Sequence, residues 1–537
     1  MKKQSLMTGT VLLLGSAVCT KLLGALFKLP LTNLLGGTGM GYFGSAYGLF
    51  LMIYALSASG MSSAVAKLTA EAVAQGVCHT ARRLKALSLL WFSLIGLLGT
   101  AIMLLGAKVF CVSVAENPDA YLSVLVLAPS LLISCVAAVY RGYYEGLRCM
   151  TPTAVSQLAE AAVRFFCGLW LCRLTLANGE AVLAVLPEGT SLLAAASAAA
   201  VGGVTISSAA GLLVLVLMDL FCGDRSLQQS DSHEPCASWR VQTKNLFAIL
   251  VPVALGALAS NLTSLIDLAT GIRGVTAAIL RDPQRFSVFG MESASQTANF
   301  LFGCFTGLSV TVFNLVPSVT NMLGKSALPA VASAYARRDS QTLARDSAAV
   351  LETTAILAFP AGMGLAFLSR QILAFLFPDR VLEVYAAAPS LMWLGIGVGA
   401  LCISGTLFSM LQAIGKARLP VCLMLIGVVV KLVGNLILIP LPSLHIAGAG
   451  AATALCYTVI AVLALRAYGR ETGSHLQLCS MCLPPAYASL MCAMSAVLAH
   501  SLLASHLGRL TLPAAVAVGG VVYLIVLRTI RPRREKS

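Results

Sequence analysis

The sequence predicts an all-α polytopic membrane protein with about fourteen transmembrane helices, and three observations support this fold class. Hydrophobic residues make up 58% of the 537 residues, charged residues make up only 11%, and the mean hydropathy is +0.88. Long apolar stretches follow one another, each near the roughly 20 residues that a helix needs to cross a bilayer. The second half of the chain also repeats the first half weakly.

An apolar run begins directly after the basic N-terminal residues and continues past Cys19, with Lys21 and Lys28 set into it. A cleaved signal peptide would end in a small-residue cleavage pattern, and the run has none, so we expect this helix to be retained. In chain order the predicted spans are residues 6–27, 40–60, 86–107, 121–141, 153–174, 192–221, 245–269, 296–319, 348–368, 386–411, 419–440, 446–466, 484–504 and 511–528.

A glycine pattern lies between the first two spans, where Gly39, Gly41 and Gly44 match the dinucleotide-binding motif G-x-G-x-x-G. That motif has chemical meaning only after a strand, and it needs an acidic residue about 20 positions later. Here a long apolar helix precedes it and no such acid follows, so we reject nucleotide binding. We expect these glycines to permit a tight external turn and close packing of the second helix.

Basic residues are distributed unevenly across the predicted membrane. Of the 36 Lys and Arg residues, 24 fall on one side, 8 on the other and 4 within spans. Since basic residues are enriched in cytoplasmic loops, both termini are predicted to be cytoplasmic. The net charge of +15 therefore indicates topology and contact with anionic membrane lipids. No basic stretch is interleaved with aromatic residues, so we expect no nucleic-acid partner.

The cysteines predict neither disulfides nor a metal centre. All 16 lie singly, most of them within apolar runs, where small polarizable side chains pack well. His475, Cys479 and Cys482 have metal-like spacing but lack a fourth ligand, so we predict no metal and no cofactor. The external loops are mostly short, and the longest, near 270–295, contains no histidine. We therefore expect a protein that is not an enzyme.

The internal repeat divides the chain into two lobes of six helices each. An even number of helices gives both lobes the same orientation, with the substrate site at their interface near mid-membrane. We predict an N-terminal lobe at 1–221, a cytoplasmic linker at 222–244, a C-terminal lobe at 245–470, and two additional helices with a basic cytoplasmic tail at 471–537. The repeated pairs are Ala64–Lys67 with Ala330–Ser333, Ala128–Ser130 with Ala388–Ser390, and Pro152 with Pro420.

Ionisable residues within or beside the spans are the candidate site, because a charge at the bilayer centre costs roughly 3 kcal/mol and usually faces a cavity or a partner. Lys21 and Lys28 are seven residues apart and share one helix face. A cavity with surplus cations selects anions, above all phosphate groups. The candidate substrate-binding residues are Lys21, Lys28, Lys67, Arg164 and Lys431.

Several of these charges also have structural interpretations. Lys28 and Lys67 have the reach to snorkel to the membrane interfaces. Glu160 and Arg164 have the i,i+4 spacing of an ion pair within one helix, and Asp267 is placed to pair with Arg273. As an alternative, Asp267 and Glu160 are the candidates for coupling to Na⁺ or H⁺.

Short motifs throughout residues 5–470 resemble one known family. They resemble the stage V sporulation protein B type of polysaccharide-flippase homologue, in the multidrug/oligosaccharidyl-lipid/polysaccharide exporter superfamily that also contains the lipid II flippases. The motifs are Lys21-x-x-Gly24, Lys28-x-Pro30, Gly39-x-Gly41-Tyr42, Ala46-Tyr47, Ser59-Gly60, Ala64–Leu68, Arg141–Gly146, Thr151–Gln157, Leu265–Asp267, Thr306–Ser309, Phe313–Pro317, Leu411–Ala413 and Gly415-Lys416.

This resemblance implies fourteen helices in two lobes within the bacterial cell membrane, and movement of an undecaprenyl-diphosphate-linked saccharide across the bilayer. It also implies that Lys21, Lys28 and Lys67 line the cavity, because basic residues of the first two helices do so in the family. Lipid II flippases carry arginines on the first, second and eighth helices. This chain has lysines on the first two, and only Glu292 at the entry to the eighth.

Three functions remain open at this point. A flippase for polyprenyl-diphosphate-linked saccharides, working as a monomer by alternating access, needs a cationic cavity. A cation-coupled drug or metabolite antiporter of the MATE type would need surplus carboxylates instead. A scaffold for cell-wall or spore-coat assembly would tolerate charge substitutions within the spans. The surplus of cations over carboxylates within the spans favours the flippase.

Overall fold

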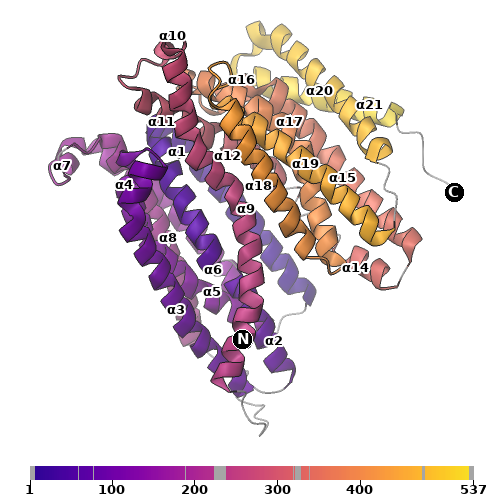
Figure 1. Ribbon diagram of the computed structural model, residues 1–537. Coiled ribbons are helices and arrows are strands. Elements are labelled where there is room, and N and C mark those ends of the chain that lie inside the picture. The colour runs from indigo at the N-terminus through magenta and orange to yellow at the C-terminus, as the bar shows by residue number, and fades with distance from the viewer. Residues whose placement is uncertain are drawn as a thin grey trace. The chain divides into compact units, whose positions relative to one another are not determined.

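The computed structural model describes residues 6–58, 60–75, 78–187, 189–222, 238–318, 320, 328–337, 339–473 and 478–530. Within these ranges every regular element is a helix (Figure 1). The first nine α-helices are α1 (Leu6–Ser57), α2 (Met61–Ala74), α3 (Cys78–Val109), α4 (Tyr121–Leu127), α5 (Pro129–Gly146), α6 (Thr151–Ala177), α7 (Gly179–Leu183), α8 (Leu192–Cys222) and α9 (Trp239–Arg281).

The remaining helices follow in the same way. They are α10 (Pro283–Phe286), α11 (Ala294–Cys304), α12 (Val310–Phe313), α14 (Leu328–Ala336), α15 (Ser340–Phe367), α16 (Ser369–Leu376), α17 (Val381–Ala413), α18 (Arg418–Leu438), α19 (Ala447–Thr472), α20 (Leu478–Leu507) and α21 (Thr511–Ile530). Short 3₁₀ or π turns occupy Phe110–Val114, Pro118–Ala120, Ser287–Phe289, Phe305–Ser309 and Gly508–Leu510. The predicted all-α fold class is confirmed.

Thirteen helical segments of the described chain are long and apolar enough to cross a membrane. The first of them, Gly15–Ala74, has 60 residues and is long enough for two crossings. It therefore contains both of the first two predicted spans, which explains the difference from the fourteen expected. The protein is a multi-pass membrane protein.

The glycine turn between the first two spans lies earlier than predicted. Gly39, Gly41 and Gly44 are all inside α1, so the prediction of a turn at these residues is wrong. The backbone instead breaks its helical conformation at Gly36, with φ 62° and ψ −169°. Glycine adopts a positive φ without the strain that a side chain would add, so the kink is confined to this residue.

Contacts between residues divide the chain into two compact units, Met1–Leu268 and Ala269–Ser537. The boundary falls inside α9, so residues 245–268 pack with the N-terminal unit. Leu246 and Leu250 of α9 are buried in a cluster of that unit, which accounts for this assignment. Residues 223–237 of the predicted linker lie outside the described residues, and the predicted lobe boundaries stay predictions.

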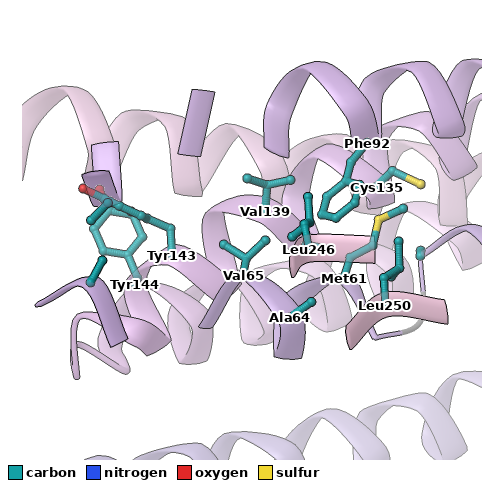
Figure 2. Packing of buried hydrophobic residues seen from close by; sticks show 14 of the residues in the cluster. Met61, Ala64, Val65, Phe92, Cys135, Val139, Tyr143, Tyr144, Leu246 and Leu250 are labelled. Carbon is teal, nitrogen blue, oxygen red and sulfur yellow. The ribbon is translucent and has the colours of Figure 1, made fainter. Parts of the chain in front are cut away.

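The core of the N-terminal unit joins α2, α3, α5 and the start of α9 (Figure 2). Met61, Val65, Phe92 and Val139 come from the first three of these helices and meet Leu246 of the fourth. All five side chains are buried. In a bilayer, close van der Waals packing of this kind holds helices together, because lipid tails are as apolar as the side chains.

Helices α6 and α8 approach each other at a pair of glycines. A Cβ atom added to Gly203 of α8 would lie 2.3 Å from the Cα atom of Gly168 in α6. A Cβ atom at Gly168 would also lie 2.8 Å from the ring of Phe27 in α1. Only glycine permits this approach, which brings α1, α6 and α8 together beside the charged residues described below.

The C-terminal unit is built around α15, α17 and α19, and its described polar contacts inside the bundle are mainly between neutral groups. The Ser347 and Tyr468 hydroxyl groups lie 2.6 Å apart, and those of Thr354 and Thr406 lie 3.1 Å apart. The Tyr523 hydroxyl of α21 donates to the backbone carbonyl of Ile356 in α15 at 2.8 Å. Helices α20 and α21 pack on each other and α20 packs on α15.

Candidate functional site

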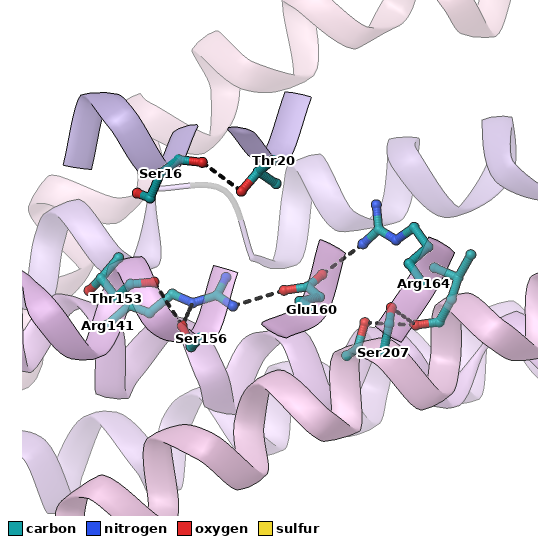
Figure 3. A network of polar contacts seen from close by, with 10 residues as sticks. Ser16, Thr20, Arg141, Thr153, Ser156, Glu160, Arg164 and Ser207 are labelled. Atoms are coloured by element: carbon teal, nitrogen blue, oxygen red, sulfur yellow. Dashed lines mark hydrogen bonds and ion pairs between the residues drawn. The ribbon is translucent and has the colours of Figure 1, made fainter. Parts of the chain in front are cut away.

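The N-terminal unit contains a carboxylate held between two guanidinium groups (Figure 3). Glu160 of α6 accepts from Arg141 of α5 at 2.8 Å and from Arg164 of its own helix at 2.7 Å. The Glu160–Arg164 pair has the i,i+4 geometry that the spacing suggests. The side chains of Arg141, Glu160 and Arg164 retain 18%, 21% and 25% exposure, so the group is shielded but not sealed.

The Nε atom of Arg141 has a hydrogen-bond acceptor, whereas the Nε atom of Arg164 has none among the described residues. Arg141 Nε donates to the Ser156 hydroxyl at 3.1 Å, and that hydroxyl donates to the Thr153 carbonyl at 3.0 Å. Arg164 Nε is buried and has no acceptor among the described residues. Two cations share one carboxylate, so the group carries a formal charge of +1 and keeps an unused donor on Arg164.

Lys21 and Lys28 lie on α1, which packs against α6. Figure 3 shows Ser16 and Thr20 of α1 in view with the charged group, and Lys21 directly follows Thr20. Phe27, which directly precedes Lys28, packs its ring against Gly168 of α6. Lys21 is exposed and Lys28 is half-buried. Both predicted lysines therefore lie in the same unit as Arg141, Glu160 and Arg164 and add to its positive charge.

Lys67 lies apart from this group, on α2. Its ammonium is 3.9 Å from Glu71 Oε1, one helical turn later, and the side chain is 60% exposed. An exposed i,i+4 pair at this distance contributes little to stability. The predicted role of Lys67 in substrate binding stays a prediction.

The remaining two predicted residues have different surroundings. Asp267 is half-buried near the C-terminal end of the N-terminal unit. Lys431 belongs to the C-terminal unit, where it is only 3% exposed on α18. One turn after it, the buried Asn435 amide donates to Thr270 Oγ1 at 2.9 Å. Their roles in coupling and binding stay predictions.

A second charged group in the N-terminal unit escapes prediction from sequence. Lys85 of α3 contacts both carboxylate oxygens of Asp219 in α8, at 2.6 and 2.7 Å. The Tyr144 hydroxyl donates to the same carboxylate at 2.6 Å, and the ammonium lies 4.9 and 4.8 Å from the Tyr140 and Tyr143 ring centroids. This group is neutral overall and ties α3, α5 and α8 together.

The two missed cations lie at the edges of predicted spans, Lys85 just before 86–107 and Arg141 at the end of 121–141, so the sequence does not place either beside a carboxylate. In the structure both lie within helices, because α3 begins at Cys78 and α5 continues to Gly146. Asp219 falls inside the predicted span 192–221. An acidic residue within a span is a signal that points to a nearby cation, although it does not say which one.

The described residues contain no group of three or more potential metal ligands. His475 of the weak Cys/His pattern lies outside the described residues. The guanidinium and ammonium groups of the N-terminal unit are suited to the recognition of anions. Phosphate is well matched, because it accepts several charge-assisted hydrogen bonds at once.

Solved structures with the same fold include two transporters. A MATE-family multidrug transporter of the MOP superfamily, in an inward-facing conformation, superposes with a TM-score of 0.65 at 14% identity, covering 84% of this chain and 94% of its own. Lipid II flippase MurJ in an inward closed conformation gives 0.64 at 14% identity, covering 98% of both chains. The fold is thus that of the MOP-type transporters.

Sequence relatives narrow this class. The family model described as polysaccharide biosynthesis protein matches residues 6–268, and that described as lipid II flippase MurJ matches residues 308–516. Stage V sporulation protein B of Bacillus subtilis is 24% identical over 467 residues, 86% of this chain and 83% of its own. Lipid II flippase MurJ of the same organism is 25% identical over 469 residues, 84% and 80% of the two chains. The chain is similar in sequence to these two proteins along most of its length, and it shares its fold with the solved transporters.

Proposed function

We propose that this protein moves a polyprenyl-diphosphate-linked saccharide from the cytoplasmic to the outer leaflet of the bacterial plasma membrane. The observation that carries the proposal is the surplus of cations in the N-terminal unit, where Arg141 and Arg164 share Glu160 while Lys21 and Lys28 lie on the adjacent α1. A diphosphate carries at least two negative charges and matches this surplus.

In this mechanism the diphosphate binds from the cytoplasm, the polyprenyl tail stays in lipid, and the two lobes alternate between inward and outward access. Lys21, Lys28 and Arg164 contact the phosphates, with the unused Arg164 Nε as one donor. Lys67 and Lys431 are the remaining proposed substrate contacts. The uneven distribution of Lys and Arg supports cytoplasmic termini and hence the direction of entry.

The negative charge of the bound diphosphate allows the membrane potential to act as an energy source. The membrane potential acts on a bound anion with about 2.3 kcal/mol per elementary charge for every 100 mV. Asp267 and Glu160 are the proposed alternatives for coupling to H⁺ or Na⁺. Glu160 already accepts from two guanidinium groups, those of Arg141 and Arg164.

Transport in reconstituted vesicles tests the proposal. The full chain is placed in liposomes with a panel of fluorescent polyprenyl-diphosphate saccharides, and the fraction accessible to an impermeant quencher is followed. Faster flipping than in protein-free liposomes is expected for at least one glycan. Absence of flipping across the panel, with export of cationic dyes against a proton or Na⁺ gradient, would instead establish a drug antiporter.

The antiporter is retained as the second candidate because a MATE-family transporter shares the fold at a TM-score of 0.65. The charge of the described N-terminal unit disfavours it, since a cationic drug would meet an excess of arginine and lysine. The third candidate, an assembly scaffold, predicts that neutral substitutions at Lys21 leave cellular function intact.

A further inference from the structure

A second polar site lies in the C-terminal unit, at the end that carries α10 and α16 (Figure 1). A cavity of about 180 Å³ is enclosed by the turn after α9, the start of α17 and the segment between α18 and α19. The Arg281 guanidinium donates to the Pro440 carbonyl at 3.0 Å and fastens two of these segments to each other. In the proposed orientation this end faces the cell exterior.

His445 is the unusual residue of this cavity. Its backbone is left-handed with φ 38°, a conformation that non-glycine residues rarely adopt and that costs free energy. Its Nδ1 atom is buried and has no hydrogen-bond partner in the described part of the chain. A strained backbone and an unsatisfied buried polar atom on the same residue both destabilise the fold, which points to a function for this imidazole.

One cation accompanies the imidazole. Arg285 lines the cavity, and no hydrogen bond or ion pair to its guanidinium is found among the described residues. Its backbone N–H donates to the Asp282 carboxylate at 3.4 Å. Burial, and secondly the charge of Arg285, lower the pKa of His445 to about 4, so the imidazole is neutral at physiological pH.

Aromatic rings form the wall of the cavity. The His445 and Phe286 rings meet edge to face with centroids 5.7 Å apart, Phe286 and Phe289 are 6.4 Å apart, and Phe289 and Tyr385 are also 6.4 Å apart. Phe286 and Phe289 are buried, whereas Tyr385 is exposed at the entrance. A continuous apolar surface thus ends at one cation and one unsatisfied imidazole.

We propose that this cavity binds a single carboxylate-bearing sugar ring, with its carboxylate at Arg285 and His445 and its apolar face against Phe286, Phe289 and Tyr385. The volume is below the roughly 300 Å³ at which sites for larger ligands begin, so one ring fits and an oligosaccharide does not. The site is separate from the cationic cluster of the N-terminal unit and does not depend on transport.

Charge balance distinguishes a carboxylate from a phosphate monoester. The site offers one formal positive charge, which a carboxylate neutralises completely. A phosphate monoester brings a charge of about −1.5 to −2 at neutral pH, which is more than the single Arg285 cation neutralises. A neutral sugar would leave the Arg285 guanidinium without an anion.

Ligand binding to the purified full chain tests this assignment with matched probes. D-glucuronate and D-glucose differ at one ring substituent, a carboxylate in place of a hydroxymethyl group, and inorganic phosphate serves as the alternative anion. Saturation-transfer NMR titrations at pH 7.5 should show glucuronate binding at least tenfold more tightly than glucose or phosphate. Equal binding of glucuronate and glucose, or tighter binding of phosphate, would overturn the assignment.

Variants connect the binding to these residues. Arg285→Gln should weaken glucuronate binding at least tenfold and glucose binding little. His445→Asn should also weaken it, and asparagine tolerates the left-handed backbone, so the fold is preserved. Arg370→Gln, an equal charge change at an exposed position of α16, is the control and should change binding less than twofold. Loss of binding in the control, or unchanged binding in Arg285→Gln, contradicts the proposal. The readout involves no lipid, so it is independent of flipping.

Discussion

The two units differ in where they keep their charges. In the N-terminal unit ion pairs lie along the membrane helices, as with Arg141–Glu160–Arg164 and Lys85–Asp219. In the C-terminal unit the described ion pairs lie at helix ends, as Arg380–Glu383 and Lys416–Glu471 do, while hydroxyl groups join the helices inside.

This difference indicates that the two units have different roles. Ionised groups within a membrane are costly and are retained where they meet a charged ligand or one another. Hydrogen bonds between neutral hydroxyl groups cost less free energy to bury in a membrane, and they join helices without adding net charge. The N-terminal unit therefore carries the proposed diphosphate chemistry, and the C-terminal unit supplies a largely neutral bundle with one buried lysine, Lys431.

The largest expected effect comes from removing a cation of the N-terminal unit. Lys21→Ala should abolish flipping while membrane insertion and abundance stay normal, because loss of a charge within a span lowers the insertion cost. Lys21→Arg should keep partial activity, since the charge survives in a different shape. Lys28→Ala should be milder than Lys21→Ala. Flipping rates in liposomes with matched protein content are the measurement.

Lys108→Ala is the control for this series, because Lys108 is an exposed lysine in the last turn of α3. Its flipping rate should equal that of the unaltered protein. Normal flipping in Lys21→Ala, or a loss that follows reduced abundance, would assign Lys21 a structural role and remove the proposed contrast between the units.

The next effect is on stability and concerns the shared carboxylate. Glu160→Gln leaves Arg141 and Arg164 facing each other without an anion. The cost should be about 3 kcal/mol, at the low end for one partner of a buried pair, because these side chains keep some exposure. Thermal unfolding of the detergent-solubilised protein measures it.

The double variant Glu160→Gln/Arg164→Gln sharpens this test. It removes one of the two repelling cations, so the melting temperature should recover in part while flipping stays low. Full recovery of both stability and flipping would show that Arg164 serves Glu160 alone and has no contact with the substrate.

A smaller effect is expected where α6 and α8 cross. Gly203→Ala places a methyl group against the Gly168 backbone, and separating the helices should cost about 1 to 3 kcal/mol, as other over-packed cores do. Gly202→Ala is the matched control, since a Cβ atom there would meet Val126 at 3.4 Å, an ordinary contact. Melting temperatures of the two variants give the comparison, and equal values would exclude a tight crossing.

A further expected effect, which reaches its full size only near pH 4, is a pH dependence in the C-terminal unit. The pKa of His445 is about 4 in the folded protein and near 6.5 when unfolded, so between these values the unfolded chain binds more protons. Stability from this residue is complete above pH 6.5 and falls as the pH approaches 4, by about 3 kcal/mol at most. Arg285 also lines the cavity beside His445.

Melting temperatures between pH 7.5 and 4.5 measure this dependence, with His445→Asn as the comparison. The variant should lose less stability on acidification than the unaltered protein. Identical profiles would mean that His445 is protonated in the folded state without cost and is not buried as described.

Local patterns in the sequence by itself determine the membrane helices of this protein and one of its ion pairs. Long apolar runs predict membrane helices wherever they occur, because the bilayer requires about 20 apolar residues per crossing. The Glu160–Arg164 pair is equally local, since residues four apart on a helix always face each other. The excess of cations over carboxylates could likewise be counted from the sequence alone.

The tertiary structure alone decided which charges meet across helices. Glu160 contacts Arg141 from α5, and Lys85 contacts Asp219, 134 residues away, because packing brings those helix faces together. The sequence has several glycines in this region, and only the backbone conformation shows that the turn lies at Gly36 and not at Gly39. The cavity at Arg285 and His445 arises where segments 160 residues apart meet. Helical periodicity specifies which residues share a face, whereas the partner of that face depends on contacts formed throughout the unit.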